Sequence, residues 1–169
     1  MRINNKLLVK SLIYALIFIF LTVLETGILS GLKTKPNLII SLITAAAIVE
    51  NERYAAIFGM TCGFLIDSSV GTPFLFSGIY YLFAAYITAI LSKSHFTKSL
   101  FAMIVIILPV CLVREIFNMF YLIGAWKDFN MTKAIFAYIF PEYIYTVACA
   151  PLIFLLVKFT AGRISYSNL

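Results

Sequence analysis

The chain has 169 residues, of which 63% are hydrophobic and 12% are charged. Soluble domains carry about 25% charged residues, so this composition excludes an ordinary soluble protein and indicates a single polytopic membrane domain over residues 1–169. The net charge of +6 does not indicate nucleic-acid binding, because the basic residues flank hydrophobic segments instead of forming a basic stripe with interleaved aromatic side chains.

The apolar segments predict an all-α membrane protein, a compact bundle of six transmembrane helices, with five as the alternative. A bilayer core about 30 Å thick takes about 20 helical residues. The expected spans are residues 8–29, 36–49, 54–68, 74–92, 100–123 and 142–159. The second and third spans are short, and short spans thin the bilayer locally. Residues 131–140 are too few to cross, and we expect them to lie at the membrane interface.

The distribution of lysine and arginine predicts the orientation. With the N-terminus in the cytoplasm, the inside segments hold eight basic residues and the outside loops hold four, with Arg114 left out because it falls within a span. The inside residues are Arg2, Lys6, Lys10, Arg53, Lys93, Lys98, Lys158 and Arg163, and the outside residues are Lys33, Lys35, Lys127 and Lys133. The positive-inside rule therefore predicts that both termini are cytoplasmic.

The second span is expected to begin at Pro36, because proline is favourable in the first turn of a helix. In the third span, Gly59, Gly63 and Asp67 are four residues apart, so each is turned only about 40° from the last. Small residues at this spacing let another helix approach closely. Asp67 then either ends the helix near the interface or belongs to a tightly packed seam with a conformational or partner-contact role.

The spans also contain the charged residues Glu25, Arg114 and Glu115. Pro109 is expected to kink the fifth span five residues before Arg114. Adjacent residues on a helix point about 100° apart, so we do not expect Arg114 and Glu115 to pair with each other. Each is expected to pair with another helix or to reach the interface where the span ends. Asp67 and Glu25 are the candidate partners of Arg114. Structural pairing, a transport or signalling role and, for Glu25, a simple interfacial position all remain open.

No catalytic or metal-binding pattern stands out. The chain has no Walker A loop, no HExxH and no GxSxG, and its acidic residues are scattered. The three cysteines lack a CxxC spacing, which argues against a zinc site. We therefore expect a non-enzymatic protein without a metal or cofactor.

The order of these features resembles MreD, the rod shape-determining membrane protein family of bacteria. The stretch with Pro36 and Asn37 looks like the x-P-[DN]-L opening of the family's second helix. A second stretch is similar to the family's glycine-rich G-x-x-x-G-x-x-x-D motif and the turn that follows it. Its members are Gly59, Gly63, Asp67, Gly71, Pro73 and Gly78.

The end of the chain carries the third likeness and two departures. Pro141 is followed ten residues later by Pro151, like the family's last-helix pattern. Where many relatives have asparagine shortly after the first of these prolines, this chain has Tyr145 and Thr146. The first span also carries the acid Glu25.

The resemblance implies a non-catalytic component of the machinery that elongates the lateral cell wall, located in the bacterial cytoplasmic membrane. Such a protein helps to position peptidoglycan synthesis through helix–helix contacts. The implied partners are an MreC-like protein, the MreB cytoskeleton, a RodA-type glycosyltransferase and a class B penicillin-binding protein, together with membrane lipids.

A six-helix bundle is also similar to the substrate-binding subunits of energy-coupling-factor vitamin transporters, which gives the alternative function. Those subunits dock their transporter partner through small-xxx-small spacing in the first helix. Here the first span offers only Gly27 and Gly31 at its far end, which argues against this alternative. A membrane scaffold for another process is the third possibility.

Overall fold

The computed structural model describes residues 5–31, 34–70, 76–95, 99–125, 135 and 139–166. This part of the chain forms six α-helices and one short 3₁₀ helix, so the all-α prediction is confirmed for it. The helices are α1 (Asn5–Thr26), η1 (Ile28–Gly31), α2 (Leu38–Val49), α3 (Glu52–Val70), α4 (Phe76–His95), α5 (Leu100–Ala125) and α7 (Phe140–Tyr166). Most of the expected interfacial segment 131–140 lies outside the described residues.

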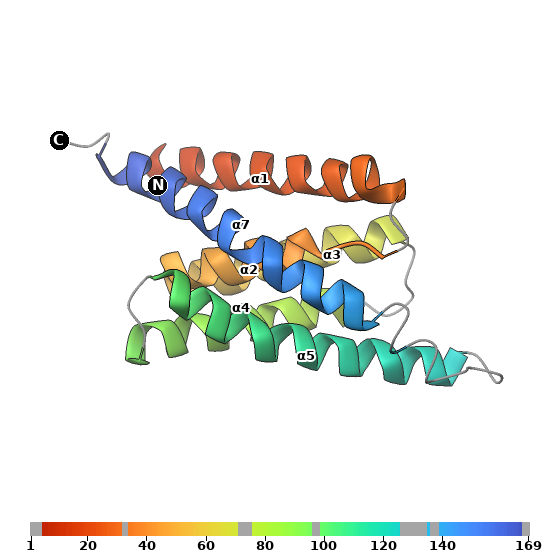
Figure 1. Cartoon of the computed structure of the whole chain (residues 1–169). Helices are drawn as coiled ribbons and strands as arrows, with labels where there is room; N and C mark the ends of the chain where they lie inside the picture. Colours follow the sequence, from red (N-terminus) through yellow and green to blue (C-terminus); the bar gives the residue numbers. More distant parts are fainter. Residues whose placement is uncertain are drawn as a thin grey trace.

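Successive helices run in opposite directions through the bundle (Figure 1). The first turn of α1 and the last turn of α7 lie at the same end, which we call the terminal end (Figure 1). The turn from α2 to α3 is also at the terminal end. At the opposite end, called the far end, α1 leads into α2, α3 into α4 and α5 into α7.

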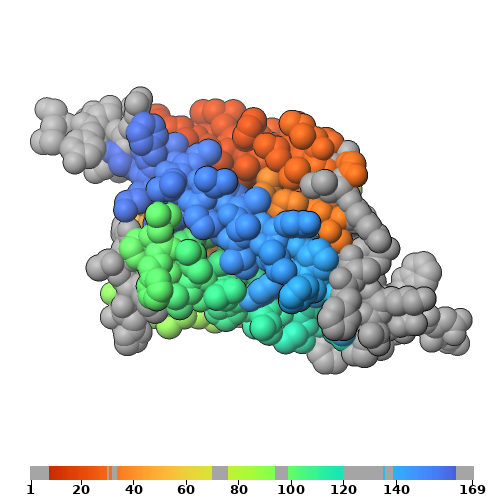
Figure 2. Space-filling model, in the orientation of Figure 1, coloured from red at the N-terminus to blue at the C-terminus, as the bar shows by residue number. Residues whose placement is uncertain are grey.

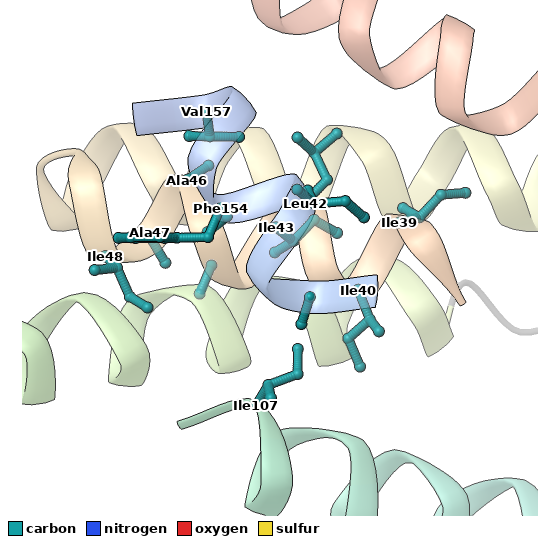
Figure 3. Packing of buried hydrophobic residues seen from close by; sticks show 14 of the residues in the cluster. Ile39, Ile40, Leu42, Ile43, Ala46, Ala47, Ile48, Ile107, Phe154 and Val157 are labelled. Atoms are coloured by element: carbon teal, nitrogen blue, oxygen red, sulfur yellow. The ribbon is translucent and has the colours of Figure 1, made fainter. Parts of the chain in front are cut away.

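Helix α2 is the core of the bundle. Every residue from Leu38 to Ile48 is buried, and the helix contacts each of the other five α-helices. Its sequence is apolar on all sides, which is typical of a helix surrounded by protein. Figure 3 shows its aliphatic side chains beside Phe154 and Val157 of α7 and Ile107 of α5.

The start of α2 corrects the prediction for Pro36. The helix begins at Leu38, two residues later than expected, and Pro36 lies outside it. The reason is Asn37, whose side-chain Oδ1 accepts a hydrogen bond from the backbone N–H of Ile40 at 2.9 Å. This N-cap satisfies one of the free donors of the first turn and fixes the starting point of the helix.

The outer faces of the other helices are strongly apolar. Among the described residues, four helices are long and apolar enough to cross a membrane, over Leu8–Thr26, Phe76–Lys93, Leu100–Met119 and Phe140–Gly162. Large hydrophobic side chains are exposed along α1, α4, α5 and α7, and three of these helices form the face shown in Figure 2, where α7 lies between α1 and α5. Soluble proteins rarely expose apolar surface on this scale, and a lipid-facing bundle requires it.

Helix α5 continues through Pro109 as a single helix. The carbonyl groups on both sides of this proline accept hydrogen bonds from tyrosines of neighbouring helices. Tyr80 of α4 donates to the carbonyl of Val110, and Tyr143 of α7 donates to that of Leu108. These two hydrogen bonds tie α4 and α7 to the middle of α5.

Candidate functional site

Gly59 and Gly63 lie where α3 meets α4. A Cβ atom added to Gly59 would lie 2.6 Å from the carbonyl oxygen of Tyr81, and one added to Gly63 would lie 2.5 Å from the Cα of Gly78. Both distances are shorter than real Cβ contacts, so neither position accepts a side chain without a shift of the α4 backbone. The two helices are in direct backbone contact, the arrangement that small-xxx-small spacing allows.

Gly78 supplies the matching surface on α4. A Cβ atom there would lie 2.2 Å from the ring of Phe64 on α3. Three of the glycines in the family-like motif therefore fit α3 and α4 against each other. Gly71 and Pro73, which complete that motif, lie outside the described residues.

Asp67 completes this contact by capping α4. Its side chain is 3% exposed, and its Oδ2 accepts hydrogen bonds from the backbone N–H groups of Ser77 at 2.9 Å and Gly78 at 3.3 Å. These donors belong to the first turn of α4, where N–H groups have no partner within their own helix and a negative charge is favourable. Asp67 does lie in the last turn of α3, but it is buried between helices. We call Gly59, Gly63, Asp67 and Gly78 the glycine–aspartate seam.

Asn37 connects α2 to α7. Its backbone N–H donates to Thr146 Oγ1 at 2.8 Å, and that hydroxyl donates in turn to the carbonyl oxygen of Glu142 at 2.7 Å. Ser41 donates to the carbonyl of Thr146 at 3.5 Å. Thr146, one of the departures from the family pattern, thus holds the N-terminus of the central helix. Sequence reasoning did not assign this role to it.

The charged residues of the spans meet nearby, at the far end of the bundle. Arg114 Nη1 of α5 lies 2.9 Å from Glu115 Oε1 and 3.0 Å from Glu142 Oε1 of α7. Glu25 of α1 interacts electrostatically with Arg114, and its Oε2 accepts a hydrogen bond from the N–H of Leu38 at 3.2 Å. We call Glu25, Arg114, Glu115 and Glu142 the arginine cluster.

The arginine cluster corrects one prediction and bears on another. Arg114 and Glu115 do pair with each other, because the arginine side chain is long enough for its guanidinium to cross the 100° between adjacent helix positions. Of the two candidate partners of Arg114, Glu25 lies in the cluster, whereas Asp67 caps α4. The partner from another helix is Glu142. No feature of the sequence distinguished Glu142 from an interfacial acid at the start of its span.

The cluster is ionic and largely shielded from solvent. The side chains of Arg114, Glu115 and Glu142 are 22%, 10% and 28% exposed. The Arg114 guanidinium bonds the carboxylates of Glu115 on its own helix and of Glu142 on α7. The third carboxylate, Glu25 of α1, bonds the first N–H of α2. Ionisable groups at membrane depth face protein and pair with one another, since exposure to lipid is costly. The cluster therefore joins α1, α2, α5 and α7.

A second set of ion pairs lies at the terminal end. Lys10 of α1 pairs with Glu50, which also accepts a hydrogen bond from the hydroxyl of Tyr14 at 2.9 Å. Lys93 of α4 pairs with Glu52, and the hydrogen bond from Lys93 lowers the pKa of the Glu52 carboxyl. From the sequence, both lysines were used only to predict the orientation of the chain in the membrane. In the structure they also tie α1 and α4 to the turn between α2 and α3.

Among the described residues, no group of three or more His, Cys, Asp or Glu side chains is arranged to hold a metal ion. The described part of the chain is all-helical, and four of its helices are long and apolar enough to cross a membrane, which is the pattern of a polytopic helical membrane protein. Comparison with known proteins finds no family model, no curated protein and no solved structure that matches it.

Proposed function

We propose that the chain is an MreD-type protein, a non-catalytic integral component of the bacterial cell-shape machinery that helps to position peptidoglycan synthesis. The observation that supports this proposal is the role of the residues that carry the resemblance. Gly59, Gly63 and Gly78 set the spacing of α3 and α4, while Asn37 and Asp67 cap the helices that follow them. Residues of this kind maintain the shape of a surface for partners.

The rest of the bundle fits a protein that acts by lateral contact. The central helix α2 is enclosed on all sides, so the core is fixed by packing. Around it, α1 and the outer faces of α4 and α5 offer broad apolar surfaces to the membrane. An MreC-like protein, a RodA-type glycosyltransferase and a class B penicillin-binding protein are the proposed partners there, with the MreB cytoskeleton on the cytoplasmic side.

The proposed topology has six spans in the bacterial cytoplasmic membrane, with both termini in the cytoplasm. The alternating helix directions and the shared location of the two chain ends support an even number of crossings (Figure 1). The eight-to-four distribution of basic residues supports the cytoplasmic assignment. In this arrangement the terminal end faces the cytoplasm and the arginine cluster lies toward the outer leaflet.

Affinity capture of the tagged full chain in mild detergent, followed by mass spectrometry, tests this function. Recovery of an MreC-like protein and a penicillin-binding protein is the expected result, and depletion of the chain should make rod-shaped cells round. A Gly63→Leu variant, which should disrupt the seam, should lose these partners, whereas Leu152→Ala on the exposed face of α7 should keep them.

Recovery of an ABC-type ATPase, together with vitamin auxotrophy on depletion, would instead support the transporter alternative. Normal cell shape after depletion, with none of the proposed partners recovered, would contradict the proposed function.

A further inference from the structure

Helices α1 and α3 border a groove of about 790 Å³ on the outside of the bundle. On α1 it is lined by Ser11, Ala15 and Phe18, and on the other side by the outward face of α3 from Glu52 to Leu65. The two hydroxyls of Ser11 and Tyr54 face each other across it, 3.4 Å apart. The groove therefore begins at the terminal end and runs toward the middle of the bundle.

The lining of the groove changes from polar to apolar along its length. Its polar residues, Ser11, Asn51, Glu52, Arg53 and Tyr54, lie at the terminal end. Beyond them the lining is mostly apolar, with Ala15, Phe18, Ile57, Phe58 and Leu65. From Arg53 to Leu65 a helix rises about 18 Å, close to the thickness of one leaflet of a bilayer core of about 30 Å.

The polar end of the groove has one more cation than its ion pairs use. Glu50 is paired with Lys10, and Glu52 is paired with Lys93. The side chain of Arg53 is exposed and forms no ion pair or hydrogen bond within the described part of the chain. It interacts electrostatically with the neighbouring Glu52 carboxylate, which Lys93 already binds. A guanidinium presents donors in a planar fork that fits two oxygens of a phosphate group, so Arg53 is suited to an anionic headgroup.

We propose that this groove binds one anionic phospholipid from the leaflet at the terminal end. The headgroup phosphate is held by Arg53, with the Ser11 and Tyr54 hydroxyls close by, and an acyl chain lies against Ala15, Phe18 and Phe58. The match between groove length and leaflet thickness favours a lipid over a helix from a partner or a second copy. A spanning helix would need contacts through the whole membrane, and the lining of this groove stops at Leu65.

Native mass spectrometry of the purified full chain tests the proposal with two added lipids, phosphatidylglycerol and phosphatidylcholine. The wild-type chain should prefer phosphatidylglycerol, and Arg53→Gln should reduce that preference about fivefold, the effect expected for one cation at an anionic lipid surface. The matched control is Lys35→Gln, which removes an exposed cation at the far end and should leave the preference unchanged.

A second variant tests the position of the acyl chain. Ala15→Phe fills the groove and should reduce the occupancy of both lipids several-fold. Leu16→Phe, at the neighbouring exposed position outside the groove lining, should not change it. Arg53→Gln that behaves like Lys35→Gln, or Ala15→Phe that behaves like Leu16→Phe, would overturn the proposal.

A dimer that Ala15→Phe dissociates would likewise overturn the proposal and assign the groove to a second copy of the chain. These measurements use purified protein and read out bound lipid, so they are independent of whether the chain acts in cell shape.

Discussion

Substitutions of Asp67 separate the charge of this side chain from its hydrogen bonds. Its Oδ2 accepts from the N–H groups of Ser77 and Gly78, and Gly78 is buried. Asp67→Leu removes the acceptor and leaves the Gly78 N–H enclosed between α3 and α4. Asp67→Asn keeps an oxygen of similar size and position but removes the negative charge. The two variants should therefore differ in stability.

The expected magnitudes follow from these contacts. A buried donor that loses its acceptor costs about 1–3 kcal/mol. Removal of a negative charge from the N-terminus of a helix costs about 0.3–1 kcal/mol. We therefore expect Asp67→Leu to lower the free energy of unfolding by about 1–4 kcal/mol, and Asp67→Asn by about 1 kcal/mol or less.

Reversible unfolding in mixed micelles with increasing SDS measures this difference. Ser68→Leu and Ser68→Asn are the matched controls, because Ser68 is the next residue on α3 and its side chain is exposed. Both controls should change stability by less than about 0.5 kcal/mol, as exposed substitutions usually do. Equal stability of Asp67→Leu and Ser68→Leu would show that the cap on α4 contributes nothing and would refute the reasoning.

Three further predictions concern packing, the arginine cluster and topology. Gly63→Ala should destabilise the chain in the same assay by roughly 1–3 kcal/mol, because the new Cβ meets α4 backbone, whereas Gly162→Ala has open space and should not. Arg114→Leu should cost roughly 3 kcal/mol, since it leaves the carboxylates of the cluster without their cation, and a double variant that also neutralises Glu142 should recover part of this loss. Reporter fusions after Leu169 and within residues 33–35 should report opposite sides of the membrane, and reports from the same side would contradict six spans.

The sequence allowed the helices to be predicted because hydropathy depends on composition within each segment. The limits were less predictable: α3 begins at Glu52, within the charged turn at residues 50–53, and α7 continues to Tyr166, beyond the expected end at residue 159. The central position of α2 could not be predicted, because a helix that is apolar on all sides carries no periodicity to show which neighbours surround it. Its first residue was wrong for a local reason: Asn37 competes with Pro36 to define the start, and the side-chain cap decides it.

The candidate site was predictable only in part. The spacing of Gly59 and Gly63 indicates a close approach, since that property belongs to one helix, but it does not identify α4 as the partner. The prediction for Arg114 and Glu115 was wrong because it used the directions of the Cα–Cβ bonds and ignored the reach of a long side chain. Glu142 was missed because it lies at the start of its span, where an acid also fits an interfacial position.

Two acids at the far end perform the same task in different parts of the bundle. Glu25, in the last turn of α1, accepts a hydrogen bond from the N–H of Leu38 at the start of α2. Asp67, in the last turn of α3, does the same for the first turn of α4. In both cases a helix that reaches the far end caps the next helix in the chain.

This shared arrangement explains how a helix as short as α2 is accommodated. Its 12 residues rise only about 18 Å, well short of a bilayer core of about 30 Å, so in the proposed topology one of its ends lies within the membrane. A helix end at that depth is stable only where its free N–H groups are bonded within the protein. Asn37 and Glu25 supply those bonds, and the arginine cluster holds Glu25 in place electrostatically. Glu25 and the arginine cluster, whose charges lower the hydropathy of the spans, therefore help the central helix to end inside the bundle.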